Sequence, residues 1–148
     1  MYSNLDKMSG IYKVALALVF VLALTSLVEF SDGGAVDNKV LVTINNTLSD
    51  NKMLTVRCKD KHDDLGIRKI KPEDIYQFYA DEAFLWSCSF QFGNKFHQFD
   101  IYDKNRDAGF CPNGCYYEVE DNKLCQIKFY AYEPRDTHCF DWNGKRID

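Results

Sequence analysis

Six cysteines are the residues of this sequence whose number and spacing point most directly to a chemistry. An even number of cysteines in a short exported chain predicts a disulfide framework, and complete pairing leaves no thiolate to act as a nucleophile. Six cysteines allow fifteen pairings. Their positions favour Cys58 with Cys88 between two strands and Cys111 with Cys115 across a short loop, and Cys125 would then pair with Cys139 by exclusion.

The histidines are the next residues that could perform chemistry. A secreted ribonuclease uses two histidines as general acid and base, and His62 with His97 could fill those roles. Neither lies in a recognisable catalytic motif, and no basic stretch marks an RNA-binding pocket. Ser87 and Ser89 fall within a predicted strand rather than in the G-x-S-x-G turn that presents a nucleophile. We therefore expect a protein that is not an enzyme, with a ribonuclease-type hydrolase as the least favoured alternative.

An acidic run at Asp60, Asp63 and Asp64 invites comparison with a calcium-binding loop. Such a loop needs oxygen ligands at alternating positions and a glutamate at the twelfth, whereas basic residues interrupt this run and Lys71 occupies the twelfth place. Aspartate side chains also stabilise ordinary turns by accepting hydrogen bonds from nearby backbone N–H groups. The sequence therefore predicts a solvated turn, with no metal ion and no cofactor.

The overall composition excludes two broad classes of protein. Hydrophobic residues make up 46% of the chain and aromatic residues 15%, which is too apolar for a disordered chain. The net charge of -4 and the isoelectric point near 5.3 predict no nucleic acid partner, which would require a basic face. Neither value identifies a partner, and we expect a monomer.

Residues 1–35 are predicted to be a cleaved signal peptide. Val14–Val28 is an uncharged, mainly apolar stretch, preceded by lysines and followed by small residues up to Ala35. A membrane-spanning helix needs about 20 apolar residues, so we expect no stable membrane association after cleavage. The mature domain would be residues 36–148, secreted and extracellular. Asn45 begins an Asn-Asn-Thr sequon, which predicts a glycoprotein with N-glycosylation at this residue.

Alternating apolar and polar side chains predict short strands throughout the mature region. The clearest strands are 40–44, 54–58, 85–92 and 124–132, and the weaker ones are 75–79, 96–102, 115–120 and 138–142. Turn residues separate these segments, and no helical period is sustained over three turns. The pattern predicts one all-β domain: a small, disulfide-stapled antiparallel β-sandwich of about eight strands.

The same alternation predicts which side chains are buried. The expected core includes the aromatic residues Trp86, Phe90, Phe92, Phe129 and Trp142. Cys125 alternates with Gln126, so we expect the cysteine on the apolar face of its strand and the glutamine on the opposite face.

A series of short motifs follows a fixed order along the mature region. The sequence V-T-I-N-N-T-L begins at Val42, and an acidic D-D-L-G run follows the strand that ends at Cys58. A Y-Q-F strand begins at Tyr76, the strand L-W-S-C-S-F contains Cys88, and C-P-N-G-C-Y-Y begins at Cys111. Together, in this order and spacing, they resemble the plant self-incompatibility protein family, whose members are also called S-protein homologues.

The resemblance runs from about Val40 to Trp142, nearly the whole mature chain, and it includes two departures. Tyr117 stands where many members have tryptophan. Cys125 and Cys139 add a pair to the four cysteines typical of the family. The first departure leaves the expected fold intact, and the second implies a subgroup with a third bridge.

The resemblance implies a secreted plant β-sandwich that acts in extracellular recognition or signalling. In the members that gave the family its name, the protein is a stigma ligand recognised by a pollen cell-surface receptor. The implied partner is therefore an unidentified receptor protein, and the implied process is pollen–stigma rejection. A secreted defence protein, or a lectin-like protein that binds glycans, is the alternative.

If recognition is the function, loops on the sandwich are expected to carry it. The two longest predicted loops, residues 59–74 and 103–114, contain charges of both signs. The residues expected to contact a partner are Asp60, Asp63, Asp64, Lys104 and Arg106.

Overall fold

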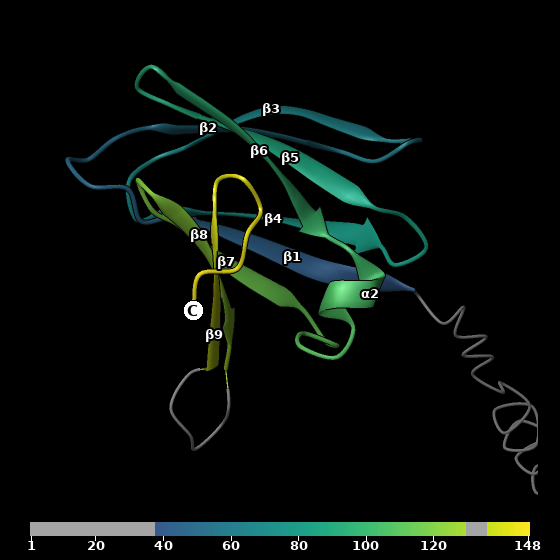
Figure 1. The fold of residues 1–148 in the computed structure, drawn as a ribbon. Coiled ribbons are helices and arrows are strands. Elements are labelled where there is room, and N and C mark those ends of the chain that lie inside the picture. Colours follow the sequence, from purple (N-terminus) through teal and green to yellow (C-terminus); the bar gives the residue numbers. More distant parts are fainter. Residues whose placement is uncertain (1–37, 130–135) are drawn as a thin grey trace, which may run out of the picture. The chain divides into compact units, whose positions relative to one another are not determined.

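The computed structural model describes residues 38–129 and 136–148 (Figure 1). In chain order the elements are β1 (Lys39–Asn46), β2 (Leu54–Lys59), β3 (Asp64–Ile70), β4 (Ile75–Asp81), β5 (Trp86–Phe92), β6 (Lys95–Tyr102), α2 (Lys104–Asp107), β7 (Cys115–Val119), β8 (Lys123–Lys128) and β9 (Asp136–Asp141). The predicted signal peptide lies outside the described residues and stays a prediction. No helix among the described residues is long and apolar enough to cross a membrane.

The strands form two sheets that pack face to face. Sheet A has the order β4-β1-β7-β8-β9, and sheet B has the order β3-β2-β5-β6. Of the strand pairs in the described part of the chain, β1 with β7 is the parallel one, with Val42 beside Cys115. The predicted disulfide-stapled β-sandwich is confirmed. The parallel pair could not be predicted, because side chains alternate in the same way in parallel and antiparallel strands.

One strand, β3, occupies a segment predicted to be a loop. The prediction of a loop over residues 59–74 was wrong for Asp64–Ile70, which pairs with β2 and places Ile70 opposite Leu54. β3 is an edge strand in which only Ile70 is buried. A strand that is mostly exposed lacks the apolar alternation by which strands are recognised in a sequence. The other predicted loop, residues 103–114, likewise contains the helical turn α2.

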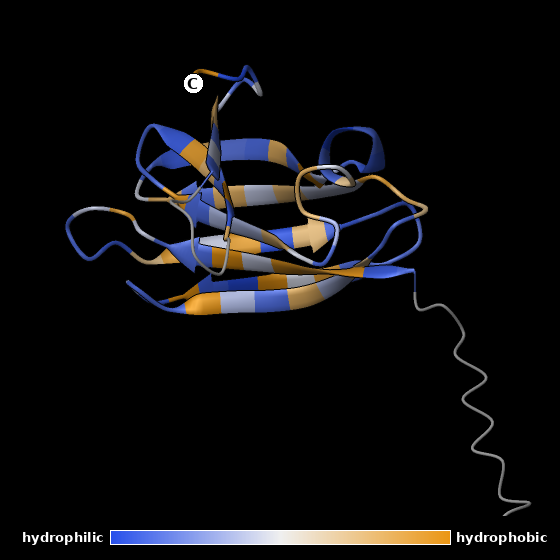
Figure 2. Cartoon of the chain, turned by 90° about the horizontal axis from the view of Figure 1, so that it is seen from below, coloured by the Kyte–Doolittle hydropathy of each residue, from blue (hydrophilic) through white to orange (hydrophobic). Residues whose placement is uncertain are grey.

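Aromatic side chains from the two sheets meet in the core. Phe78 of β4 packs on Trp86 of β5 with ring centroids 5.3 Å apart, and Phe99 of β6 meets Tyr117 of β7 edge-on at 6.4 Å. Figure 2 shows hydrophobic and hydrophilic residues alternating along the strands. The predicted burial of three aromatic residues is confirmed, and Trp142 is partly buried against the same core. The three are Trp86, Phe90 and Phe92.

Strand β8 is turned over relative to the prediction. Gln126, expected outside, is fully buried opposite Tyr117, its cross-strand partner. Phe129, expected in the core, is 58% exposed, and Cys125 lies on the outer face of sheet A. All of residues 124–127 are buried, so both faces of β8 are covered. When both faces are covered, the order of apolar and polar residues no longer shows which face points inward.

All three predicted bridges are formed, and the described residues contain no free cysteine. They are Cys58–Cys88, Cys111–Cys115 and Cys125–Cys139. The first joins β2 to β5 and the third joins β8 to β9, in both cases at directly opposed positions with Cα atoms 4.1 Å apart. Each of these bridges stays within one sheet or loop, so the contact between the sheets depends on apolar packing.

Removing the bridges one pair at a time should reveal the order of their contributions to stability. A bridge acts mainly by restricting the unfolded chain, and more strongly when the closed loop is longer. The residues paired are 30, 14 and 4 positions apart for Cys58–Cys88, Cys125–Cys139 and Cys111–Cys115. Loop closure alone then gives about 4, 3 and 2 kcal/mol. Urea unfolding of the three Cys→Ala pair variants should follow this order, and the largest loss from the shortest loop would contradict it.

Candidate recognition site

Three segments that are distant in the sequence meet at one end of the sandwich. They are residues 60–63 between β2 and β3, residues 82–85 between β4 and β5, and α2 (Figure 1). The Phe84 ring joins the first two, because Lys61 Nζ lies 4.3 Å from its centroid and the His62 ring lies 4.9 Å away. Lys104 Nζ of α2 lies 3.5 Å from Glu82 Oε2. We call these three segments the loop end.

Asp60 shapes the turn between β2 and β3. Its Oδ1 accepts hydrogen bonds from the backbone N–H groups of His62, at 2.7 Å, and Asp63, at 2.5 Å. Partial burial raises the pKa of Asp60, but these backbone donors and the neighbouring cations outweigh burial, so the pKa falls below its ordinary value. The charged carboxylate holds the turn, and the side chain of Asp63 is exposed beside it.

Asp64 lies in β3 and is paired with Arg57 of β2. Nε of Arg57 donates to both carboxylate oxygens at 3.1 Å, Nη2 makes a further bond, and the Gly66 N–H donates to Oδ1 at 2.9 Å. The bond from Arg57 is the main cause that lowers the pKa of Asp64 to about 2. The prediction that placed Asp64 in a loop was therefore wrong, and its charge is already paired within sheet B.

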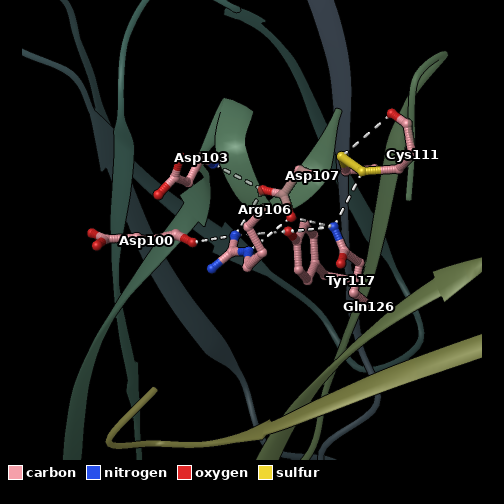
Figure 3. Close-up of a disulfide and its surroundings, with 8 residues drawn as sticks. Asp100, Asp103, Arg106, Asp107, Cys111, Tyr117 and Gln126 are labelled. Atoms are coloured by element: carbon pink, nitrogen blue, oxygen red, sulfur yellow. Dashed lines mark hydrogen bonds and ion pairs between the residues drawn. A yellow bond between two sulfur atoms is a disulfide. The ribbon is translucent and has the colours of Figure 1, made fainter. Parts of the chain in front are cut away.

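Arg106 belongs to a buried network beneath α2 (Figure 3). Its Nε and Nη2 donate to the two oxygens of Asp107 at 2.7 and 2.8 Å, and Nη2 also donates to the Asp100 carbonyl at 2.7 Å. The guanidinium carbon lies 5.0 Å from the centroid of Phe99 and 5.3 Å from that of Phe140. The predicted loop position of Arg106 was wrong, because the residue lies in a helical turn and most of its side chain is engaged within the fold.

The Asp107 carboxylate at the centre of this network is completely buried. Besides Arg106, it accepts hydrogen bonds from the Asp103 backbone N–H at 2.8 Å and from Gln126 Nε2 at 3.0 Å. Gln126 Nε2 also donates to the Tyr117 hydroxyl at 2.9 Å. Burial first, and the charge of Asp107 second, raise the pKa of Tyr117, so its hydroxyl stays protonated. The network thus connects α2 to β7 and β8.

A groove along sheet B adjoins the loop end, and residues 142–144, which follow β9, also line it. Its volume is about 840 Å³, and the exposed side chains of Ile67 and Phe96 flank it. A smaller hollow of about 400 Å³ lies beside Phe84, and Lys59 and Ser87 line both spaces. The loop end and the groove therefore form one continuous surface. Its polar floor is supplied by Thr55, Arg57, Ser87, Ser89, Gln91 and Gln98.

The three histidines are not brought together into a common site. His62 packs on Phe84, His97 stacks on Trp142 at 4.4 Å between centroids, and His138 stacks on Phe110 at 3.8 Å. Burial, with a smaller effect of Lys95, lowers the pKa of His97. Within residues 38–129 and 136–148, no cluster of three or more metal-ligating side chains occurs.

The role of Asp107 can be tested by removing its carboxylate. Asp107→Ala leaves the Arg106 guanidinium without its main partner, and breaking a buried ion pair costs about 3–5 kcal/mol. We expect a loss of this size in the free energy of unfolding, measured with urea at pH 7. Asn105→Ala, in the exposed part of the same helical turn, is the control and should change stability by less than about 0.5 kcal/mol. Equal losses of unfolding free energy in the two variants would mean that the Asp107 network does not stabilise the fold.

The Arg57–Asp64 pair predicts a local pH effect. Arg57→Gln should raise the pKa of Asp64 from about 2 toward the model-compound value of 3.8, as followed by NMR titration of its carboxyl carbon. A carboxylate whose pKa is lowered by folding stabilises the fold above the unfolded value, and this contribution disappears as the pH falls through the folded value. The part of the stability difference that comes from Asp64 should therefore shrink from about pH 4 downward and vanish only below pH 2. Arg68→Gln on β3 should leave the Asp64 titration unchanged.

Comparisons with known proteins agree with the fold and the motifs. The sequence profile described as "Plant self-incompatibility protein S1" matches residues 41–142. S-protein homolog 5 of Arabidopsis thaliana is 36% identical over 93 residues, covering 60% of this chain and 67% of the relative. S-protein homolog 2 of the same plant is 34% identical over 114 residues, covering 72% of this chain and 70% of the relative.

A solved structure of SPH (Self-Incompatibility Protein Homologue) proteins has a TM-score of 0.50 to this chain at 16% identity. The match covers 66% of this chain and 90% of that chain, and it supports the fold. The SPH proteins are described as "a widespread family of small, highly stable, secreted proteins from plants", which confirms the predicted secretion at the level of the family. From the profile match, the relatives and the shared fold, the chain belongs to the plant self-incompatibility protein S1 family, the S-protein homologues.

Proposed function

We propose that this protein is an extracellular recognition protein, a ligand for a cell-surface receptor, that binds its partner through the loop end and the adjoining groove. The observation that carries the proposal is the meeting of three distant segments around Phe84 and Glu82, next to the hollow that continues into the groove. Membership of the self-incompatibility family supports a role in recognition between cells. Pollen–stigma rejection is the most specific recognition process that we propose for it.

The surface chemistry of the loop end suits a protein partner. Leu85 is 52% exposed next to the partly buried Phe84, and Lys61 lies over the Phe84 ring. The other segments of the loop end add the exposed charges of Asp63 and Lys104. An apolar anchor within a polar rim is the usual anatomy of a protein interface. Charges of both signs favour a protein surface over a nucleic acid, which would require a predominantly basic face.

The environment of the histidines supports binding rather than catalysis. Each imidazole packs against a separate aromatic ring, at Phe84, Trp142 and Phe110, and this is a structural use of the side chain. A general acid and a general base need to reach one substrate from two sides, and histidines in separate environments do not offer that arrangement.

A charge exchange at the loop end tests the proposal. The variant Lys61→Glu with Asp63→Lys keeps the net charge but reverses the local pattern, and it should weaken binding at least about tenfold if these side chains contact the receptor. The full chain is expressed in plant cells, collected from the medium, labelled, and titrated onto plant protoplasts prepared from pollen and from leaf. Saturable binding that is lost after protease treatment of the protoplasts is expected.

The matched control exchanges charges at the opposite end of β3 and β4. Lys71→Glu with Glu73→Lys changes exposed residues in the same way and should leave binding within about twofold of wild type. Equal affinity of the two exchange variants would reject the loop end as the contact surface. Binding that survives protease but is abolished by glycosidase treatment would instead support the glycan-binding alternative. Binding to pollen protoplasts but not to leaf protoplasts would support the specific role in pollen–stigma rejection.

A further inference from the structure

The outer face of sheet A carries exposed apolar side chains, and Phe129 packs edge-on against Tyr116 there with 5.1 Å between ring centroids. Ile75 and Tyr79 of β4 are 53% and 65% exposed. Leu41 of β1 lies opposite Tyr79, and Tyr116 of β7 is partly exposed on the same face. Between the Leu41–Tyr79 pair and the Asn45–Ile75 pair lie Thr43 and Gln77, whose side chains share a hydrogen bond at 2.9 Å. Exposed apolar side chains grouped on one sheet face of a secreted protein mark a candidate surface for a cover in the mature molecule.

Asn45 lies within this apolar face. Its side chain points outward, because it alternates with the fully buried Ile44 and Asn46. Its neighbour on β4 is Ile75, and its Nδ2 donates to the Tyr116 hydroxyl at 2.9 Å. Asn45 is also the first residue of the Asn-Asn-Thr sequon. The residue that could carry a glycan thus lies at one end of this face, beside the exposed Ile75 and the Tyr116 ring.

We propose that Asn45 carries an N-linked glycan whose first N-acetylglucosamine packs against Tyr116 and Ile75 and covers this face of sheet A. A lipid-linked pyrophosphate oligosaccharide donates the sugar. A bond forms between Asn45 Nδ2 and C1 of the sugar, the C1–oxygen bond to the pyrophosphate breaks, and Nδ2 loses one proton. The modified amide keeps one N–H, and the C–H groups of the sugar ring are attracted to the electron-rich face of the Tyr116 ring.

The position of Asn45 keeps the glycan away from the loop end. Asn45 pairs with Ile75 at the beginning of β4, whereas residues 82–85 of the loop end follow the last residue of that strand. Asn45 and the loop end are therefore at opposite ends of β4. The glycan proposal requires that the chain is exported, but it does not require the proposed receptor. The glycan proposal and the receptor proposal can therefore fail independently of each other.

The first experiment measures whether Asn45 is occupied. The full chain is secreted from plant cells, and its intact mass is determined before and after treatment with peptide N-glycosidase A. Thr47→Ser keeps both the sequon and the hydroxyl that donates to the Val119 carbonyl at 2.9 Å, whereas Thr47→Ala removes both. Wild type and Thr47→Ser should carry the glycan, and Thr47→Ala and Asn45→Gln should not. Secreted wild type with an unmodified Asn45 would overturn the proposal.

The second experiment measures whether the glycan packs on Tyr116. The melting temperatures of the glycosylated protein and of the same chain produced without glycosylation, in which Asn45 stays an asparagine, are compared in wild type, Tyr116→Phe and Tyr116→Ala. We expect the glycan to raise the melting temperature by about 3 °C where an aromatic ring is present and by less than about 1 °C in Tyr116→Ala. The phenylalanine variant separates ring packing from loss of the hydroxyl. An equal increment in all three proteins would overturn the packing, even with Asn45 occupied.

Discussion

The buried carboxylate of Asp107 is the charge around which one side of the sandwich is organised. A charge removed from water is tolerated only when partners replace the lost hydration. Arg106 supplies a bidentate partner, and a backbone N–H and the amide of Gln126 satisfy the remaining acceptor sites. Because these donors come from α2 and β8, the single carboxylate ties the helical turn to sheet A. It also explains why a strand in the middle of a sheet contains an inward-pointing glutamine.

This constraint has a direct effect on the surface that we assign to recognition. With α2 held from below by Asp107, Lys104 is placed beside Glu82 of the neighbouring turn. Asp60 holds the turn that carries Lys61, and Phe84 packs against both Lys61 and His62. Each segment of the loop end is thus fixed by contacts of its own. A surface that is ordered before binding loses less conformational entropy when the partner arrives, which favours affinity.

A strand could be predicted correctly from the sequence when one of its faces is buried and the other is exposed. Strands such as β5 show clear alternation, and their aromatic residues were predicted correctly as core. β3 was missed because it is an exposed edge, and β8 was turned over because both of its faces are covered. Two bridges were guessed from the strand positions and the short loop, and Cys125–Cys139 followed only by exclusion; its opposed position in β8 and β9 was not predicted. Asp107 could not be found, because a buried carboxylate looks like any loop aspartate until its partners from other elements are known.

The parallel pairing of β1 with β7 has a consequence for the order in which the chain folds. Asn45 and Tyr116 are separated by 71 positions, yet they are joined by a side-chain hydrogen bond across these two strands. At usual rates of synthesis, about 4–14 s pass between the appearance of the first strand and that of its parallel partner. During this interval β1 can pair with β4, but its other edge has no strand to meet until β7 is made, and β8 and β9 can join sheet A only after that. The sequon on β1 is thus open to the glycosyl-transfer machinery of the translocation site for as long as that edge is unpaired.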